Sequence, residues 1–131
     1  MKVLVDTCVW SLALRRRSPD KKTIKKLTDL INDGRAVLIG PIKQELLSGI
    51  SHPDQFEKLK TILASFEEAR LKSEHFEKAA EFSNICRSKG TQGSTIDFLI
   101  CAVAHLENLQ ILTTDKDFQN YAKQLPIKLM A

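Results

Sequence analysis

Residues 3–10 read Val3-Leu4-Val5-Asp6-Thr7-Cys8-Val9-Trp10. The short apolar start, rich in β-branched residues, predicts a strand over residues 2–5. Asp6 and Thr7 favour a turn or a helix N-cap, and residues 8–17 have apolar residues at a spacing that suits a helix. A strand followed directly by a helix is therefore expected at this end of the chain.

The same alternation continues through the rest of the sequence. Gly34 is expected to end one helix, Pro41 to begin another, and Ser73 to cap a third. Helices between strands imply right-handed crossovers and a mostly parallel sheet covered on both faces, so the sequence predicts an α/β fold in one domain, residues 1–131. Further strands are expected at 36–39, near 69–71, at 110–112 and at 127–129. Further helices are expected from about 24 to Gly34, from 41 to 49, from 52–54 to about 66, from 73 to 89, from 95 to 106 and from 117 to 124.

The composition excludes several classes of protein. The chain has 131 residues, is 43% hydrophobic and has a formal net charge of +4, which favours a globular domain over a disordered chain. Its longest apolar runs are far shorter than the ~20 residues that cross a bilayer, and the early Asp6 leaves no room for a secretory signal. We expect a cytoplasmic protein without a membrane segment. Three cysteines without a CxxC pair and three scattered histidines favour neither disulfides nor zinc.

Several acidic residues occupy positions that need an explanation. Asp97 lies among apolar residues in the helix expected to be most buried, where an unpaired charge is costly. The free N–H groups at the start of its own helix could stabilise it. Asp6 could be an N-cap, Glu45 a solvated helical residue, and Asp117 part of a capping box with Thr114. Each residue taken alone therefore has a structural explanation.

The acidic residues are harder to explain together. Asp6 and Asp115 follow strands, while Glu45 and Asp97 lie on helices that must pack against the same sheet. Ligands of parallel sheets bind outside the carboxyl ends of the strands. Clustered carboxylate oxygens select Mg²⁺ or Mn²⁺, which also bind waters and a substrate phosphate. The pattern therefore predicts metal-assisted hydrolysis of phosphodiester bonds.

Four segments carry a family resemblance: Val3–Ser11, Gly40–Gly49, Gly93–Ala104 and Leu112–Phe118. In this order and spacing they resemble the motifs of PIN-domain ribonucleases, especially the VapC-type toxins of toxin–antitoxin pairs. The resemblance spans the chain and implies a three-layer α/β/α sandwich with a mostly parallel sheet. It also implies an endoribonuclease that uses Mg²⁺ or Mn²⁺, forms a homodimer, and is silenced by a cognate antitoxin whose segment fills the active groove.

The resemblance also assigns roles to individual residues. It implies a catalytic quartet of Asp6, Glu45, Asp97 and Asp115. The implied metal ligands are Asp6, Asp97 and Asp115, with Asp117 as an auxiliary ligand or a group next to the ligands. Candidate hydroxyl groups near the metal or its waters are Thr7, Ser11, Thr113 and Thr114. Cys8 departs from the family pattern, because small polar residues are frequent at its position, and it could pack as a small apolar residue.

Basic residues beside the first helix favour a polyanionic partner such as RNA. The alternative is a solvated run of charges flanking a helix. Trp10 and Tyr121 are candidates for base stacking, although core or dimer packing better suits Trp10. The candidate RNA-binding residues are Arg15, Arg16, Arg17, Lys21 and Lys22.

Two other functions stay open at this point. A PIN-like module could bind RNA or a partner protein without cleaving RNA. A magnesium-dependent phosphohydrolase acting on small substrates also begins with an acidic residue at a strand end. The aspartyl-phosphate type of that chemistry normally needs a second acidic residue two positions later, where this chain has Cys8.

Overall fold

The computed structural model describes residues 1–14 and 20–131. Its centre is a five-stranded parallel sheet in the order β3-β2-β1-β4-β5. The strands are β1 (Val3–Val5), β2 (Ala36–Leu38), β3 (Glu67–Glu68), β4 (Gln110–Leu112) and β5 (Lys128–Leu129). The central strand β1 is completely buried, which is why it is apolar without alternation.

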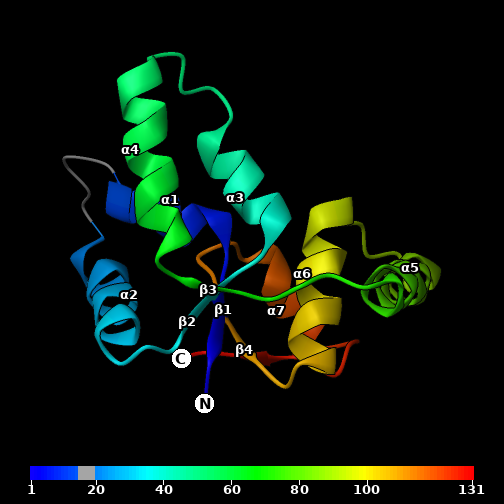
Figure 1. The fold of residues 1–131 in the computed structure, drawn as a ribbon. Helices are drawn as coiled ribbons and strands as arrows, with labels where there is room; N and C mark the ends of the chain where they lie inside the picture. The colour runs from blue at the N-terminus through cyan, green and yellow to red at the C-terminus, as the bar shows by residue number, and fades with distance from the viewer. Residues whose placement is uncertain (15–19) are drawn as a thin grey trace.

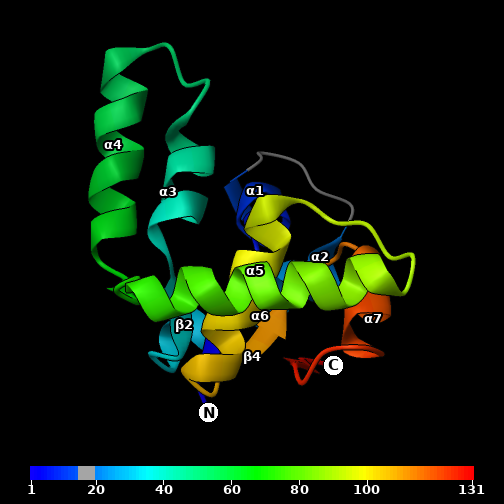
Figure 2. The same ribbon diagram turned by 90° about the vertical axis from the view of Figure 1, so that its right-hand side faces the viewer.

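Helices cover both faces of this sheet. Figure 1 shows α2 on one side of the sheet and α5 with α6 on the other, and Figure 2 shows α3 and α4 standing side by side beyond one end of it. This arrangement confirms the predicted α/β/α sandwich. In the described ranges no helix is long and apolar enough to cross a membrane. The described helices are α1 (Thr7–Leu14), α2 (Lys21–Asn32), α3 (Gly40–Leu47), α4 (Pro53–Ala64), α5 (Ser73–Ser88), α6 (Thr95–Leu106) and α7 (Asp117–Ala122).

Two expected helix boundaries are confirmed. Gly34 has a positive φ of 67° after α2, a conformation that costs glycine little. The amide of Gly34 donates to the Ile31 carbonyl at 3.1 Å, and the amide of Arg35 donates to the Leu30 carbonyl at 2.8 Å. These two carbonyl groups at the end of α2 therefore have hydrogen-bond partners. Pro41 lies in the first turn of α3.

The strand expected near 69–71 was placed wrongly, because the structure has β3 at Glu67–Glu68. These two residues pair with Val37 and Leu38 of β2. As an edge strand, β3 pairs on one side only, so its side chains can be charged and exposed. Both are ion-paired: Lys2 lies 2.6 Å from Glu67, and Lys43 pairs with Glu68. An apolar pattern could not identify such a strand.

Other boundaries shift by smaller amounts. Ser73 is the first residue of α5 rather than its cap, and the amide of Lys72 before it donates to His75 Nδ1 at 2.9 Å. The first helix begins at Thr7 and is described to Leu14, while residues 15–17 of the expected helix lie outside the described residues.

Candidate functional site

A pocket of about 590 Å³ lies where the strands β1 and β4 end. Four acidic residues from four separate segments of the chain line it. We call it the acidic pocket, and its lining is Asp6, Thr7, Cys8, Glu45, Ser94, Thr95, Ile96, Asp97 and Asp115. The structure therefore brings together all four residues of the expected catalytic quartet.

Asp6 is a buried carboxylate at the end of β1, with only 7% of its surface exposed. Its Oδ1 accepts the amide of Thr7 at 2.8 Å, and its Oδ2 accepts the Thr113 hydroxyl at 2.8 Å and the Cys8 thiol at 3.5 Å. Burial raises the pKa of Asp6, the hydrogen bonds oppose this, and the charge of Asp97 adds to the increase. Both oxygens are thus oriented, and the side chain accepts a backbone amide at the start of α1, as an N-cap would, although the donor is the adjacent Thr7.

The raised pKa of Asp6 predicts how folding stability changes when its carboxylate is replaced. Because the pKa of Asp6 is higher in the folded protein, the contribution of Asp6 to folding stability falls as pH rises from its ordinary pKa of 3.8 through its raised pKa. We expect Asp6→Asn to match or exceed the wild type in melting temperature in chelator at neutral pH, with the advantage disappearing in acid. Thermal melts across pH measure this. A clear loss at neutral pH would show instead that the Asp6 carboxylate stabilises the fold.

Glu45 lines the acidic pocket and is hydrogen-bonded to Thr7. Glu45 is exposed on α3, as a solvated helical glutamate would be. Its Oε1 nevertheless accepts the Thr7 hydroxyl at 2.8 Å, which links α3 to the start of α1. Thr7, expected as an auxiliary hydroxyl, therefore orients one of the four carboxylates.

Asp97 lies half-buried in the first turn of α6. Its amide donates to the Ser94 hydroxyl at 3.1 Å, so Ser94 is the N-cap of this helix. Its Oδ2 accepts the Tyr121 hydroxyl at 2.8 Å. Burial first, then the hydrogen bond and the charge of Asp97, raise the pKa of Tyr121, so the phenol stays a donor. The backbone of Asp97 is therefore held by the N-cap Ser94, and its carboxylate is held by the Tyr121 phenol.

Asp115 is held by the chain that surrounds it. Its amide donates to the Thr113 hydroxyl at 3.0 Å, and its Oδ1 accepts the amide of Asp117 at 2.9 Å. The capping box expected between Thr114 and Asp117 is wrong, because Asp115 takes this amide. Asp117 is exposed at the start of α7 and is not among the residues that line the acidic pocket.

The sulfur of Cys8 belongs to the polar network beside Asp6. Besides its bond to Asp6, Sγ lies 3.5 Å from the Thr113 hydroxyl. It accepts the hydroxyl of Thr114 at 3.2 Å and the amide of Thr114 at 3.5 Å. Cys8 thus joins the ends of β1 and β4 and does not act simply as an apolar residue. Thr113 and Thr114 support this network from outside the pocket lining.

The donor atoms of the acidic pocket fit a hard divalent cation. Asp6, Asp97 and Asp115 offer carboxylate oxygens, the ligands that Mg²⁺ and Mn²⁺ prefer. Over residues 1–14 and 20–131, no three acidic, histidine or cysteine side chains are grouped closely enough to form a ready-made metal cage. Mg²⁺ does not need one, because it binds through one or two carboxylates, several waters and substrate phosphates.

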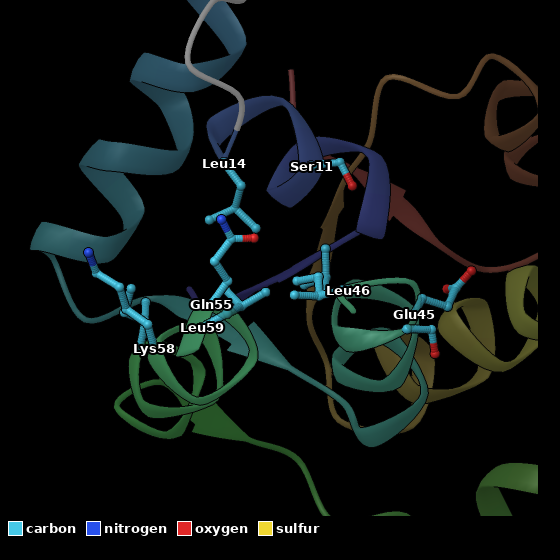
Figure 3. A pocket seen from close by; sticks show the side chains of 10 residues that line it. Ser11, Leu14, Glu45, Leu46, Gln55, Lys58 and Leu59 are labelled. Carbon is cyan, nitrogen blue, oxygen red and sulfur yellow. The ribbon is translucent and has the colours of Figure 1, made fainter. Parts of the chain in front are cut away.

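A second pocket of about 470 Å³ lies between α1, α3 and α4. Ser11 lines this pocket and not the acidic one, so the expected role of its hydroxyl near the metal is not supported by its position. Glu45 lines both pockets. In Figure 3 its carboxylate points away from Gln55 and Leu59, which come from α4. The two pockets are therefore neighbours that share one side chain.

Two of the candidate RNA-binding residues are described, and neither lines the acidic pocket. Lys21 and Lys22 are exposed at the start of α2. Arg15, Arg16 and Arg17 lie outside the described residues. Base stacking is wrong for the two aromatic candidates, because Trp10 is 3% and Tyr121 0% exposed. The Trp10 Nε1 group donates instead to the Val5 carbonyl at 3.1 Å.

The sequence analysis missed the roles of Ser94 and Tyr121. A signal existed for both. Ser94 lies three residues before Asp97, the usual spacing of an N-cap side chain and its amide donor. Tyr121 lies three residues after Phe118, so both face the same side of a short helix, and a buried phenol usually finds an acceptor.

Comparison with known proteins now gives the family. The PIN domain model matches residues 3–124. The chain belongs to the PIN domain family. No curated protein matches its sequence. The resemblance noted in the sequence is thus confirmed for the family.

Solved structures share this PIN domain fold at low sequence identity. The structure of FitAcB from Neisseria gonorrhoeae superposes with a TM-score of 0.76 at 18% identity, covering 98% of this chain and 96% of the other. VapBC2 from Rickettsia felis, bound to a DNA fragment from its promoter, gives 0.77 at 18% identity and covers 99% and 98%. A toxin–antitoxin complex from Klebsiella pneumoniae gives 0.72 at 17% identity and covers 89% and 90%. The PIN domain of this chain therefore has the same fold as chains in these complexes.

Proposed function

We propose that this PIN domain is a metal-dependent endoribonuclease that acts in the cytoplasm as the toxin of a type II toxin–antitoxin pair. The observation that carries the proposal is the meeting of Asp6, Glu45, Asp97 and Asp115 in one pocket. Four carboxylates at one site repel each other and raise the cost of folding. Such an arrangement is expected where function requires it.

Each of the four acidic side chains of the acidic pocket has a role in this proposal. Asp6, Asp97 and Asp115 would hold Mg²⁺ or Mn²⁺, and Asp117 could act only from outside the lining. The bound ion would supply charge neutralisation at the phosphate and a more acidic water. Glu45 is exposed and lines the pocket, so its carboxylate would accept a proton from the attacking water. Thr7 keeps Glu45 oriented for this step.

RNA is the proposed substrate because the protein carries an excess of basic residues. The formal net charge is +4 even though four carboxylates are concentrated in the pocket. The remaining surface is therefore more positive than the total suggests and would attract a phosphate backbone. Lys21 and Lys22, together with Arg15, Arg16 and Arg17, are the proposed backbone contacts.

A protein antitoxin is the proposed partner. The solved relatives include a toxin–antitoxin complex, and the pocket between α1, α3 and α4 offers an apolar surface beside the acidic pocket. Leu14 and Ile62 line it and are 47% and 44% exposed. A segment placed there would contact Glu45 and obstruct the acidic pocket. We also propose that the chain forms a homodimer.

Removal of metal tests the proposed activity. We expect the purified protein, free of antitoxin, to cleave single-stranded RNA with Mg²⁺ or Mn²⁺ and to lose cleavage in chelator. Gel analysis of labelled RNA measures this, with DNA of the same sequence and a small phosphate ester as alternative substrates. Binding of RNA without cleavage in any metal would support a binding module, and hydrolysis of the ester alone a phosphohydrolase.

A further inference from the structure

Tyr121 is enclosed behind the acidic pocket. It is fully buried, with ring centroids 5.2 Å from Phe98 of α6 and 5.1 Å from Phe118 of α7. It is not among the residues that line the pocket. RNA and solvent therefore do not reach the phenol, and any effect it has on the reaction must act through a neighbour.

That neighbour is Asp97. The Tyr121 hydroxyl donates to Asp97 Oδ2 at 2.8 Å, within the ordinary range of a hydroxyl–carboxylate hydrogen bond. Among the described residues, no hydrogen bond is made to Asp97 Oδ1. Asp97 also lines the pocket. One oxygen is thus engaged by the protein, and the second is left for a ligand.

Gly93 provides the space that the phenol occupies. A Cβ at this position would lie 2.9 Å from Tyr121 Cζ and 2.9 Å from Phe98 Cζ, and in still closer contact with the Tyr121 hydroxyl oxygen. The φ of Gly93 is not positive, so close approach rather than backbone conformation calls for glycine here. Gly93 directly precedes Ser94, the N-cap of the helix that carries Asp97. The phenol is therefore fitted against the same chain segment that positions the carboxylate.

We propose that Tyr121 is a positioning residue that fixes the rotation of the Asp97 carboxylate by holding Oδ2 and so presents Oδ1 to the metal, with Gly93 leaving the room for it. This inference rests on the proposed function. Without the phenol, the carboxylate could turn and pair both oxygens with other groups. Partners that orient metal ligands in this way typically contribute a factor of about 10 to 100 in metal affinity or activity.

The test compares Tyr121→Phe with the wild type in two measurements. The phenylalanine keeps the ring packed between Phe98 and Phe118 and removes only the hydroxyl. We expect Mn²⁺ binding, followed by the electron paramagnetic resonance signal of free Mn²⁺, to weaken about 10- to 100-fold. The Mg²⁺ concentration for half-maximal RNA cleavage should rise by a similar factor, with the rate at saturating Mg²⁺ changing less.

A matched control separates positioning from general destabilisation. Phe82 is buried on α5 and does not line the acidic pocket, so Phe82→Leu should lower the melting temperature without changing Mn²⁺ affinity. Gly93→Ala would push the Tyr121 side chain away from Asp97 and should therefore also weaken Mn²⁺ binding. Because both changes break one contact, the double variant Gly93→Ala/Tyr121→Phe should lose less affinity than the product of the two single losses.

The outcomes distinguish this inference from the proposed function. A folded Tyr121→Phe protein with wild-type Mn²⁺ affinity would overturn the positioning role, whatever the cleavage result. If the wild type binds Mn²⁺ but does not cleave RNA, the proposed function fails while the affinity comparison still decides the role of Tyr121. A wild type that binds no Mn²⁺ would overturn both.

Discussion

Asp97→Asn is expected to lower the rate of RNA cleavage by about 100- to 1000-fold, because it removes a charge from the proposed metal site. Charge stabilisation by a bound metal is worth several kcal/mol, and each ~1.4 kcal/mol changes a rate tenfold. The asparagine still has an oxygen that can accept the Tyr121 hydroxyl, so the fold should persist. Initial rates at saturating Mg²⁺ measure the effect, with circular dichroism to verify folding.

The matched control for this change is Asp33→Asn. Asp33 is exposed at the end of α2 and does not line the acidic pocket, so the control removes the same charge without touching the proposed metal ligands. We expect its rate to equal that of the wild type. Cleavage by Asp97→Asn at the rate of Asp33→Asn would mean that Asp97 is not a metal ligand.

The second large effect is on stability: Phe118→Ala should lower the free energy of unfolding by about 3 to 5 kcal/mol. Phe118 is fully buried, and α7 is a six-residue helix that is too short to persist without packing. Urea denaturation measures the change. Its neighbour Gln119 is exposed, and Gln119→Ala should change stability by less than about 0.5 kcal/mol. Equal losses for the two variants would contradict the packing of α7 described above.

The fold could be predicted from the sequence where apolar pattern and local chemistry agree. The buried strand at residues 3–5 has no alternation, and Gly34 and Pro41 mark helix boundaries for steric reasons. The edge strand β3 could not be predicted in this way. Its two glutamates are held by pairing with β2 and by ion pairs to distant lysines, neither of which leaves an apolar pattern.

The candidate site could be predicted as a set of residues but not as a geometry. The motifs indicated Asp6, Glu45, Asp97 and Asp115, and the structure places all four around one pocket. The hydrogen bonds that orient them depend on tertiary contacts. The bond between Thr113 and Asp6 joins residues 107 positions apart, and local spacing contains no record of it.

The position of β1 in the sheet also determines when the acidic pocket can exist during synthesis. β1, at Val3–Val5, is made before β4, at Gln110–Leu112, with which it pairs on one side. Until that part of the chain leaves the ribosome, β1 lacks one of its two neighbours, and the pocket lacks Asp115. A nascent chain, or one truncated before Asp115, therefore cannot assemble the four carboxylates, and the acidic pocket forms only after Asp115 has been made.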